Sequence, residues 1–237
     1  MPANMDSVPR YLKGMKDEQK ARPGPKLHDV PFITISRQAG AGGRSLAEAI
    51  IKRLEAGQDN PLFQNWHIFD RELCEKVAED PGIQVSLESL LNEEVRNPPE
   101  DVIFRMIARE ASQARVHGKI FKTVRDFAAV GKAIIVGRGG ACLTRGFPHG
   151  IHVRLVAPRP SRVRHAAVRF EMSQVEAERW VDGQDKHRAR LVRKYFRKDI
   201  EDFLLYDCVW NTDAVALDTI AEALVVLIEK STARAVG

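Results

Sequence analysis

The sequence predicts an α/β fold built on a five-stranded parallel sheet flanked by helices. Two observations lead to this class. Five short runs rich in β-branched and aromatic residues are typical of buried strands, and stretches with apolar residues at helical spacing separate them. Strands that alternate with helices favour a parallel sheet with right-handed crossovers. The predicted strands are Phe32–Ser36, His67–Asp70, Ala133–Val136, Ile151–Val156 and Asp207–Asn211.

The segments between these strands carry the apolar stripes of amphipathic helices. In the first of them, Leu46, Ile50 and Leu54 recur on one helical face. The predicted helices are Arg44–Glu55, Arg71–Glu79, a cluster over Leu87–Val130, Arg138–Arg145, Ser161–Phe170, Gln174–Phe196 and Thr219–Glu229.

The chain length and the distribution of proline and charged residues predict one domain preceded by a polar tail. Residues 1–30 combine mixed charge with four prolines, which is typical of a disordered segment. Residues 31–237 are long enough for a single α/β domain. Within it we expect a helical insert over about 71–130 and a lid over about 172–200.

The composition is that of an ordinary globular protein, with 44% hydrophobic and 29% charged residues. No apolar run approaches the roughly 18 residues that a membrane helix needs, and the N-terminus lacks the apolar core of a secretory signal. The three cysteines, Cys74, Cys142 and Cys208, show neither disulfide-framework nor zinc-ligand spacing. These features predict a cytoplasmic protein with no membrane partner and leave the oligomeric state undetermined.

The net charge of +5 is concentrated in one segment of the chain. Residues 159–199 hold twelve basic and six acidic side chains. A local basic cluster indicates a polyanionic partner, although a solvated helix face is the alternative for any single arginine. Few aromatic residues accompany the cluster, and no RNA-recognition or helix-turn-helix pattern is found, so nucleotide phosphates are favoured over nucleic acid.

A glycine-rich loop, SRQAGAGGRS, follows the first predicted strand directly. Gly40, Gly42 and Gly43 permit positive φ and let backbone N–H groups converge on an anion, at the positive end of the next helix. Arg44 offers a guanidinium to phosphate oxygens, and Ser45 offers a hydroxyl to Mg²⁺. Tight packing of the helix against the strand is the alternative interpretation, because a strict Walker A pattern is missing.

Two later motifs point to the same edge of the sheet. Gly137-Arg138-Gly139 follows the third predicted strand, so Arg138 is placed for an anion, with a tight turn as the alternative. In DKHRAR, Asp185 and Arg188 are one helical turn apart and predict either a local ion pair or part of a lid that closes over transferring phosphates.

Taken together, these motifs resemble the cytidylate kinase-like family of P-loop nucleoside monophosphate kinases. The matching pieces are ITISRQAGAGGRS, IFDREL, AIIVGRGGACL, DKHRARLVRKYF and YDCVWNT, and the resemblance covers about Phe32 to Ile228. It implies a three-layer P-loop kinase fold with an acceptor-binding insert and an arginine-rich lid. It also implies transfer of the ATP γ-phosphoryl group to a nucleoside monophosphate, CMP or dCMP first, with Mg²⁺.

The resemblance also implies roles for individual residues. The donor phosphates would be bound by Arg37, Gly40, Ala41, Gly42, Gly43, Arg44 and Ser45, with Ser45 on the metal. Catalytic roles would fall to Arg44, Arg138, Asp185, Arg188 and Arg190, and the acceptor would contact Asp70, Arg71 and Arg138. Placed without gaps against the family, Gly43 takes the position of the loop lysine, and Gly139 takes that of an acidic residue.

Two other functions compete with this interpretation. The altered loop also suits a non-catalytic or regulatory nucleotide-binding protein. The basic segment leaves a nucleic-acid-binding protein as a third, less favoured possibility.

Overall fold

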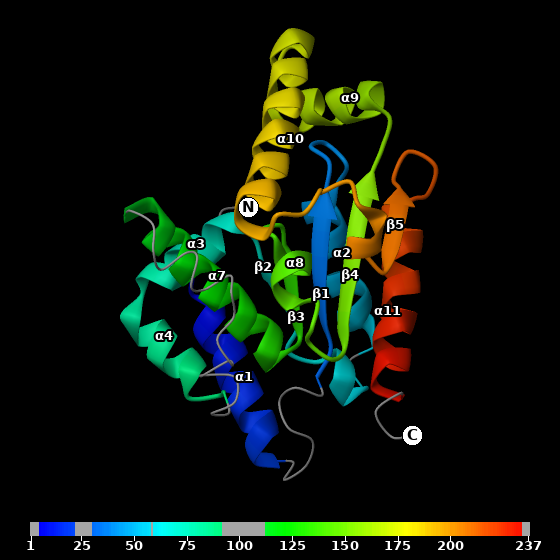
Figure 1. Cartoon of the computed structure of the whole chain (residues 1–237). Helices are drawn as coiled ribbons and strands as arrows, with labels where there is room; N and C mark the ends of the chain where they lie inside the picture. Colours follow the sequence, from blue (N-terminus) through cyan, green and yellow to red (C-terminus); the bar gives the residue numbers. More distant parts are fainter. Residues whose placement is uncertain (1–4, 22–29, 58, 92–111, 234–237) are drawn as a thin grey trace.

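The structure is a computed structural model that describes residues 5–21, 30–57, 59–91 and 112–233. Five parallel strands form one sheet in the order β2-β3-β1-β4-β5 (Figure 1). The strands are β1 (Phe32–Arg37), β2 (His67–Phe69), β3 (Ala133–Val136), β4 (Gly150–Val156) and β5 (Cys208–Asn211). The predicted sheet is therefore confirmed, with strand ends shifted by at most one residue.

Strand β1 lies at the centre of the sheet, between β3 and β4. Ile33 is opposite Ile134 on one side and Ile151 on the other. From β1 the chain crosses to β2 on one side, and from β4 it continues to β5 on the other, so the carboxyl ends of the adjacent strands β1 and β4 form the topological switch point where α/β proteins place their ligands. The glycine-rich loop begins at the carboxyl end of β1.

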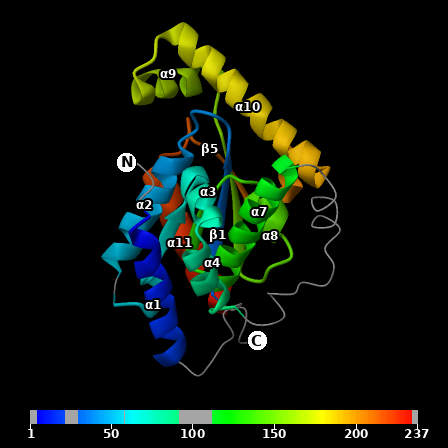
Figure 2. The ribbon, with the colours of Figure 1, turned by 90° about the vertical axis from the view of Figure 1, so that its left-hand side faces the viewer.

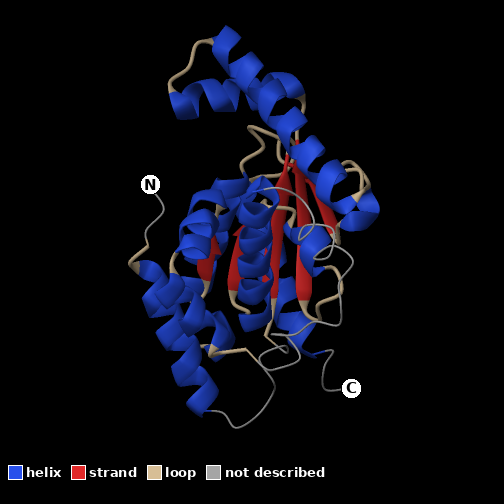
Figure 3. Cartoon of the chain, turned by 60° about the vertical axis from the view of Figure 1, so that its left-hand side comes forward, coloured by secondary structure: helices blue, strands red, loops and turns tan. Residues whose placement is uncertain are grey.

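Helices cover both faces of the sheet and complete three layers (Figures 2 and 3). Alternate residues of β1 and β3 face opposite cores, as Phe32 and Ile33 illustrate. One core contains α2 (Gly43–Ala56) and α11 (Leu217–Ala233). The opposite core contains α1 (Ser7–Ala21), α3 (Arg71–Glu79), α4 (Pro81–Glu88) and α7 (Ser112–Val130), and α8 (Gly140–Thr144) joins it through Leu143.

The prediction of a disordered tail is wrong for Ser7–Ala21, which forms α1. Its buried residues, Val8, Tyr11, Leu12 and Met15, recur at helical spacing and complete the core that α1 shares with α3, α4 and α7. The Tyr11 hydroxyl donates a hydrogen bond of 2.6 Å to the Gly131 carbonyl. Residues 1–4 and 22–29 of the predicted tail lie outside the described residues.

Two further differences concern helix boundaries. Helix α8 begins at Gly140 rather than Arg138, because Gly137, Arg138 and Gly139 all have positive φ values of 90°, 56° and 68°. The predicted helical cluster begins earlier than expected, with α4, which Pro81 starts and the Asp80 side chain caps. Its middle part, residues 92–111, lies outside the described residues.

A helical hairpin stands above the carboxyl ends of the strands (Figure 1). It consists of α9 (Arg159–Phe170) and α10 (Gln174–Phe196). A small core of its own, which includes Val163, Ala177 and Val181, also takes in Ala39 of the glycine-rich loop. The hairpin is therefore packed directly on the loop. Short 3₁₀ helices at Pro61–Phe63 and Phe203–Leu205 complete the described elements.

None of the helices in the described residues combines the length and the apolarity that crossing a membrane requires.

Candidate functional site

The glycine-rich loop forms a tight turn between β1 and α2. Gly40 and Gly42 have φ values of +80° and +84°, and Gly42 is the N-cap of α2 without a capping side chain. A Cβ atom on Gly40 would lie 2.3 Å from the carbonyl oxygen of Arg162, so only glycine fits there. The first amides of α2 consequently point out of the loop with no side-chain acceptor, which is the geometry of an anion site.

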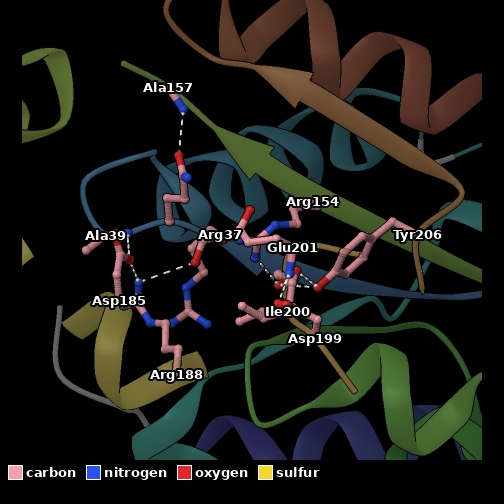
Figure 4. A network of polar contacts seen from close by, with 12 residues as sticks. Arg37, Ala39, Arg154, Ala157, Asp185, Arg188, Asp199, Ile200, Glu201 and Tyr206 are labelled. Carbon is pink, nitrogen blue, oxygen red and sulfur yellow. Dashed lines mark hydrogen bonds and ion pairs between the residues drawn. The ribbon is translucent and has the colours of Figure 1, made fainter. Parts of the chain in front are cut away.

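Asp185 holds this loop to the hairpin. One carboxylate oxygen accepts a hydrogen bond of 2.7 Å from the Ala39 amide (Figure 4). The other accepts one of 2.8 Å from the buried Arg162. Arg162 also donates to the carbonyls of Ala39 and Ala157, at 3.1 and 2.9 Å. The structure thus places Asp185, which was predicted to be catalytic, between the loop and Arg162 of α9.

Arg44, at the start of α2, is already bonded to two carboxylates. Its Nε donates to Glu48 at 2.9 Å, and its Nη1 bonds to Asp70. Asp70 in turn caps α3 by accepting the Leu73 amide at 3.0 Å. Two residues that the sequence assigned to donor and acceptor are therefore joined in one ion pair.

Ser45, the predicted metal ligand, faces a guanidinium. Its hydroxyl accepts a hydrogen bond of 2.8 Å from Arg169 of α9. A hydroxyl oxygen retains a second lone pair, so it can still contact Mg²⁺. Magnesium in phosphoryl-transfer sites needs only one or two protein oxygens, since phosphates and water supply the rest. Ser45 and the Asp70 carboxylate are oxygen donors of the right chemistry.

Further arginines lie near one another beneath the glycine-rich loop. Arg188 donates to the Arg37 carbonyl at 3.3 Å and lies 3.6 Å from Asp185 (Figure 4). Arg138, held by the turn after β3, forms a 2.9 Å ion pair with Glu75. Burial lowers the pKa of Arg188 and of Arg138. We call Arg37, Arg138 and Arg188 the floor arginines.

Three adjoining cavities form the crevice at this edge of the sheet. The loop pocket, about 610 Å³, contains Gly40, Gly43 and Ser45. The floor pocket, about 160 Å³, contains Arg138 and Arg188 and lies under α10. The side pocket, about 550 Å³, contains Arg44, Asp70 and Arg71. Arg37 lines all three, so it stands where they meet.

Aromatic side chains form the far wall of the loop pocket. Phe170 and Trp180, with ring centroids 4.7 Å apart, line it together with Val168, which is 82% exposed. This wall was not predicted from the sequence. The sequence shows two aromatic residues on the basic helices, but they can be recognised as a pocket wall only once α9 and α10 are seen packed over the loop.

The remaining predicted residues divide between the crevice and the surface. Arg71 lines the floor and side pockets and donates to Glu75 at 3.2 Å. Ala41 is buried beneath the loop, with its amide bonded to the Gln38 carbonyl at 3.2 Å. Arg190 is exposed on α10 and lines none of these three pockets.

A parallel α/β sheet with a glycine-rich loop at its switch point and an arginine-lined crevice defines a P-loop kinase-like fold. Residues 32–214 match the model of the cytidylate kinase-like family, and the chain belongs to that family. No curated protein sequence matches the chain.

Two solved structures resemble this one. An uncharacterized protein from Eubacterium ventriosum ATCC 27560 has a TM-score of 0.65 and 20% identity, over 85% of this chain and 99% of that one. Shikimate kinase from Bacteroides thetaiotaomicron has a TM-score of 0.47 and 15% identity, over 84% of this chain and 98% of that one. The first likeness supports the fold.

Proposed function

We propose that the protein transfers the γ-phosphoryl group of ATP to a nucleoside monophosphate, with CMP or dCMP as the first candidates. One observation carries the proposal: the uncapped amides of α2 and the floor arginines converge on one crevice from opposite sides. Such an arrangement suits two phosphorylated ligands held end to end.

The donor would occupy the loop pocket. Its phosphates would receive hydrogen bonds from the amides of the Gly40–Ser45 loop, and its base would lie against Phe170 and Trp180. Mg²⁺ would arrive on the ATP phosphates and neutralise part of their charge, with Ser45 and Asp70 as its protein oxygens.

The acceptor would lie beyond Arg37, with its phosphate against Arg138 and Arg188. An oxygen of that phosphate forms the new bond to the γ-phosphorus, and the bond from the γ-phosphorus to the β–γ bridging oxygen breaks. ADP and a nucleoside diphosphate are the products. The arginines neutralise the charge of the transferring group, and the hairpin limits the access of water to it.

The test is a coupled assay of ADP release with CMP, dCMP, UMP, AMP and GMP as acceptors. We expect turnover to be stimulated by at least one pyrimidine monophosphate above the acceptor-free rate. If no monophosphate stimulates ADP release, the proposed transfer is wrong.

A second function is favoured by a specific observation. Gly43 stands at the lysine position and Arg44 is engaged by Asp70 and Glu48, so the protein would bind nucleotides without transferring phosphate. Calorimetry that detects ATP or CMP binding, together with no turnover, would select this regulatory role.

A further inference from the structure

The side chain of Arg37 lies between two glycines from different elements. A Cβ atom on Gly43, the first residue of α2, would stand 3.0 Å from Arg37 Cγ and 3.1 Å from its Cδ. A Cβ atom on Gly137, after β3, would stand 2.1 Å from Arg37 Nη1. The aliphatic part of Arg37 therefore crosses the start of α2, and its guanidinium reaches the end of β3.

Arg37 has no carboxylate bonded to its guanidinium among the described residues, although the charge of Asp70 lies near enough to act on it. No hydrogen bond or ion pair joins its guanidinium to another residue in the described part of the chain. Burial, followed by the nearby charges of Arg188 and Arg138, lowers the pKa of Arg37 to about 9, and the opposite charge of Asp70 offsets only part of this shift. A half-buried cation among like charges is costly unless an anion joins it, which makes this point of the crevice suited to a phosphate.

The position of Gly43 explains why the cation comes from Arg37. In a Walker A loop the lysine follows the last glycine and reaches the β- and γ-phosphates from the first turn of the helix. Gly43 occupies that place here, and the stem of Arg37 fills the space beside it. A side chain at residue 43 would push against Arg37, so the two positions are alternatives for one cation.

We propose that Arg37 supplies the phosphate-binding cation of this loop from the end of β1, in place of a lysine at position 43. This inference rests on the proposed function, in which the loop holds the donor phosphates. The sequence-based expectation counted Arg37 among the residues around the donor phosphates but took Arg44 as the cation that replaces the loop lysine. A guanidinium at the junction of the three pockets can bridge donor and acceptor oxygens with its planar fork of donors, which a point-charge lysine cannot do in the same way.

The experiment moves the charge between the two positions. Arg37→Gln, Gly43→Lys and the double variant R37Q/G43K are compared with the natural chain for turnover with the best acceptor and for ATP binding by calorimetry. We expect Arg37→Gln to lose about 100-fold in kcat/KM, as for the loss of one transition-state donor. Gly43→Lys alone loses activity as well, because lysine displaces Arg37 and adds a like charge.

The double variant decides the relocation. With Arg37 replaced by a shorter, neutral side chain, the lysine introduced at position 43 has room to reach the phosphates. R37Q/G43K therefore recovers at least about tenfold over Arg37→Gln. Arg37→Ala and Arg37→Lys are made in parallel, and the thermal unfolding of every variant is measured. If one variant does not fold, the remaining variants still test the role of Arg37.

The outcomes separate this inference from the proposed function. If the natural chain turns over and Arg37→Gln stays within about threefold of it, the function stands and the role of Arg37 is overturned. A double variant no better than Arg37→Gln overturns the exchange between positions 37 and 43. If the natural chain binds ATP without turnover, a loss of binding in Arg37→Gln still supports Arg37 while the transfer fails.

Discussion

The glycine-rich loop contains an arginine near each end, and the two arginines are in opposite electrostatic situations. Arg44, at the start of α2, is bonded to Asp70 and Glu48. Arg37, at the end of β1, has no such partner among the described residues and is surrounded by the other floor arginines. Arg44 is therefore neutralised by the protein, whereas Arg37 retains its positive charge for a ligand, although its floor neighbours Arg138 and Arg188 lie beside Glu75 and Asp185.

A count of basic residues consequently does not locate an anion site. The exposed Arg159 and the partly exposed Arg44 are both paired with carboxylates, at distances typical of surface ion pairs that contribute little to stability. The floor arginines Arg138 and Arg188 are less exposed, and their charges lie near Arg37, an arrangement that an anion beside Arg37 would stabilise. Substitutions in the two regions test this difference, and those with the greatest expected loss come first.

The greatest loss is expected on the floor. Arg188→Ala removes a guanidinium that lines both the floor pocket and the loop pocket, so kcat/KM should fall by about 10²- to 10³-fold. Arg190→Ala is the matched control: it lies on the same helix, exposed and away from the pockets, and should stay within about twofold. Steady-state kinetics gives kcat/KM for both variants. Equal losses in the two would show that the floor carries no special charge.

The next effect concerns the clamp between loop and hairpin. Asp185→Asn keeps an acceptor for the Ala39 amide but removes the charge that balances Arg162, whose side chain is 9% exposed. We expect stability to fall by about 2 kcal/mol, because a largely buried guanidinium loses its counter-charge. kcat should fall by about tenfold, because the loop loses its fixed geometry.

Asp182→Asn is the control for this clamp. Asp182 also joins α10 to α9, through Arg159 at 2.9 Å, but that pair is solvent-exposed on both sides. Its loss should cost less than about 1 kcal/mol and leave kcat unchanged. Chemical denaturation and steady-state kinetics are measured for both variants. Equal losses of stability and of kcat in Asp185→Asn and Asp182→Asn would contradict a special role for Asp185.

A smaller effect is expected at the aromatic wall of the loop pocket. Trp180→Ala removes one of the two rings against which the donor base is proposed to lie. KM for ATP should rise by about tenfold, since a stacked aromatic contributes about 1–1.5 kcal/mol, while kcat changes little. Trp180→Phe should restore most of the affinity. A fall in kcat with KM unchanged would place the ring in the chemistry instead.

The sheet and most helices could be predicted because their signals are local. Buried parallel strands such as β1 and β3 are continuous β-branched runs, and α10 has a capping box of Ser173 and Glu176 ahead of a long regular stretch. Helix α1 could not, because its four buried residues stand among charges and beside prolines. That weak stripe finds its partners only in the folded chain, where α1 packs on α4 and Tyr11 lies against Phe69 of β2 and Phe127 of α7.

The sequence predicted which residues form the site but not which of them bond to one another. The sequence placed Arg37, Arg44 and Asp185 at the crevice; in the structure Arg37 and Arg44 line it, and Asp185 is bonded to the glycine-rich loop through the Ala39 amide. Which of them is free depends on residues far along the chain: Asp70 engages Arg44, Arg162 engages Asp185, and Gly137 makes room for Arg37. Such pairings follow from the packing of separate elements, which spacing within one motif does not encode.

The smallest effect is expected at the start of α2. Arg44→Gln removes a guanidinium that two carboxylates already neutralise, in a pair whose side chains are 28% and 23% exposed. kcat/KM should therefore change by less than about fivefold, and stability by less than about 1 kcal/mol. Arg53→Gln, on the exposed side of the same helix and paired with Glu222 at 2.6 Å, controls for the loss of a surface ion pair. A loss of about 100-fold in Arg44→Gln, the size expected for one transition-state donor, would mean that nucleotide binding releases Arg44 from Asp70. The helix start, rather than the floor, would then hold the cation that the phosphates require.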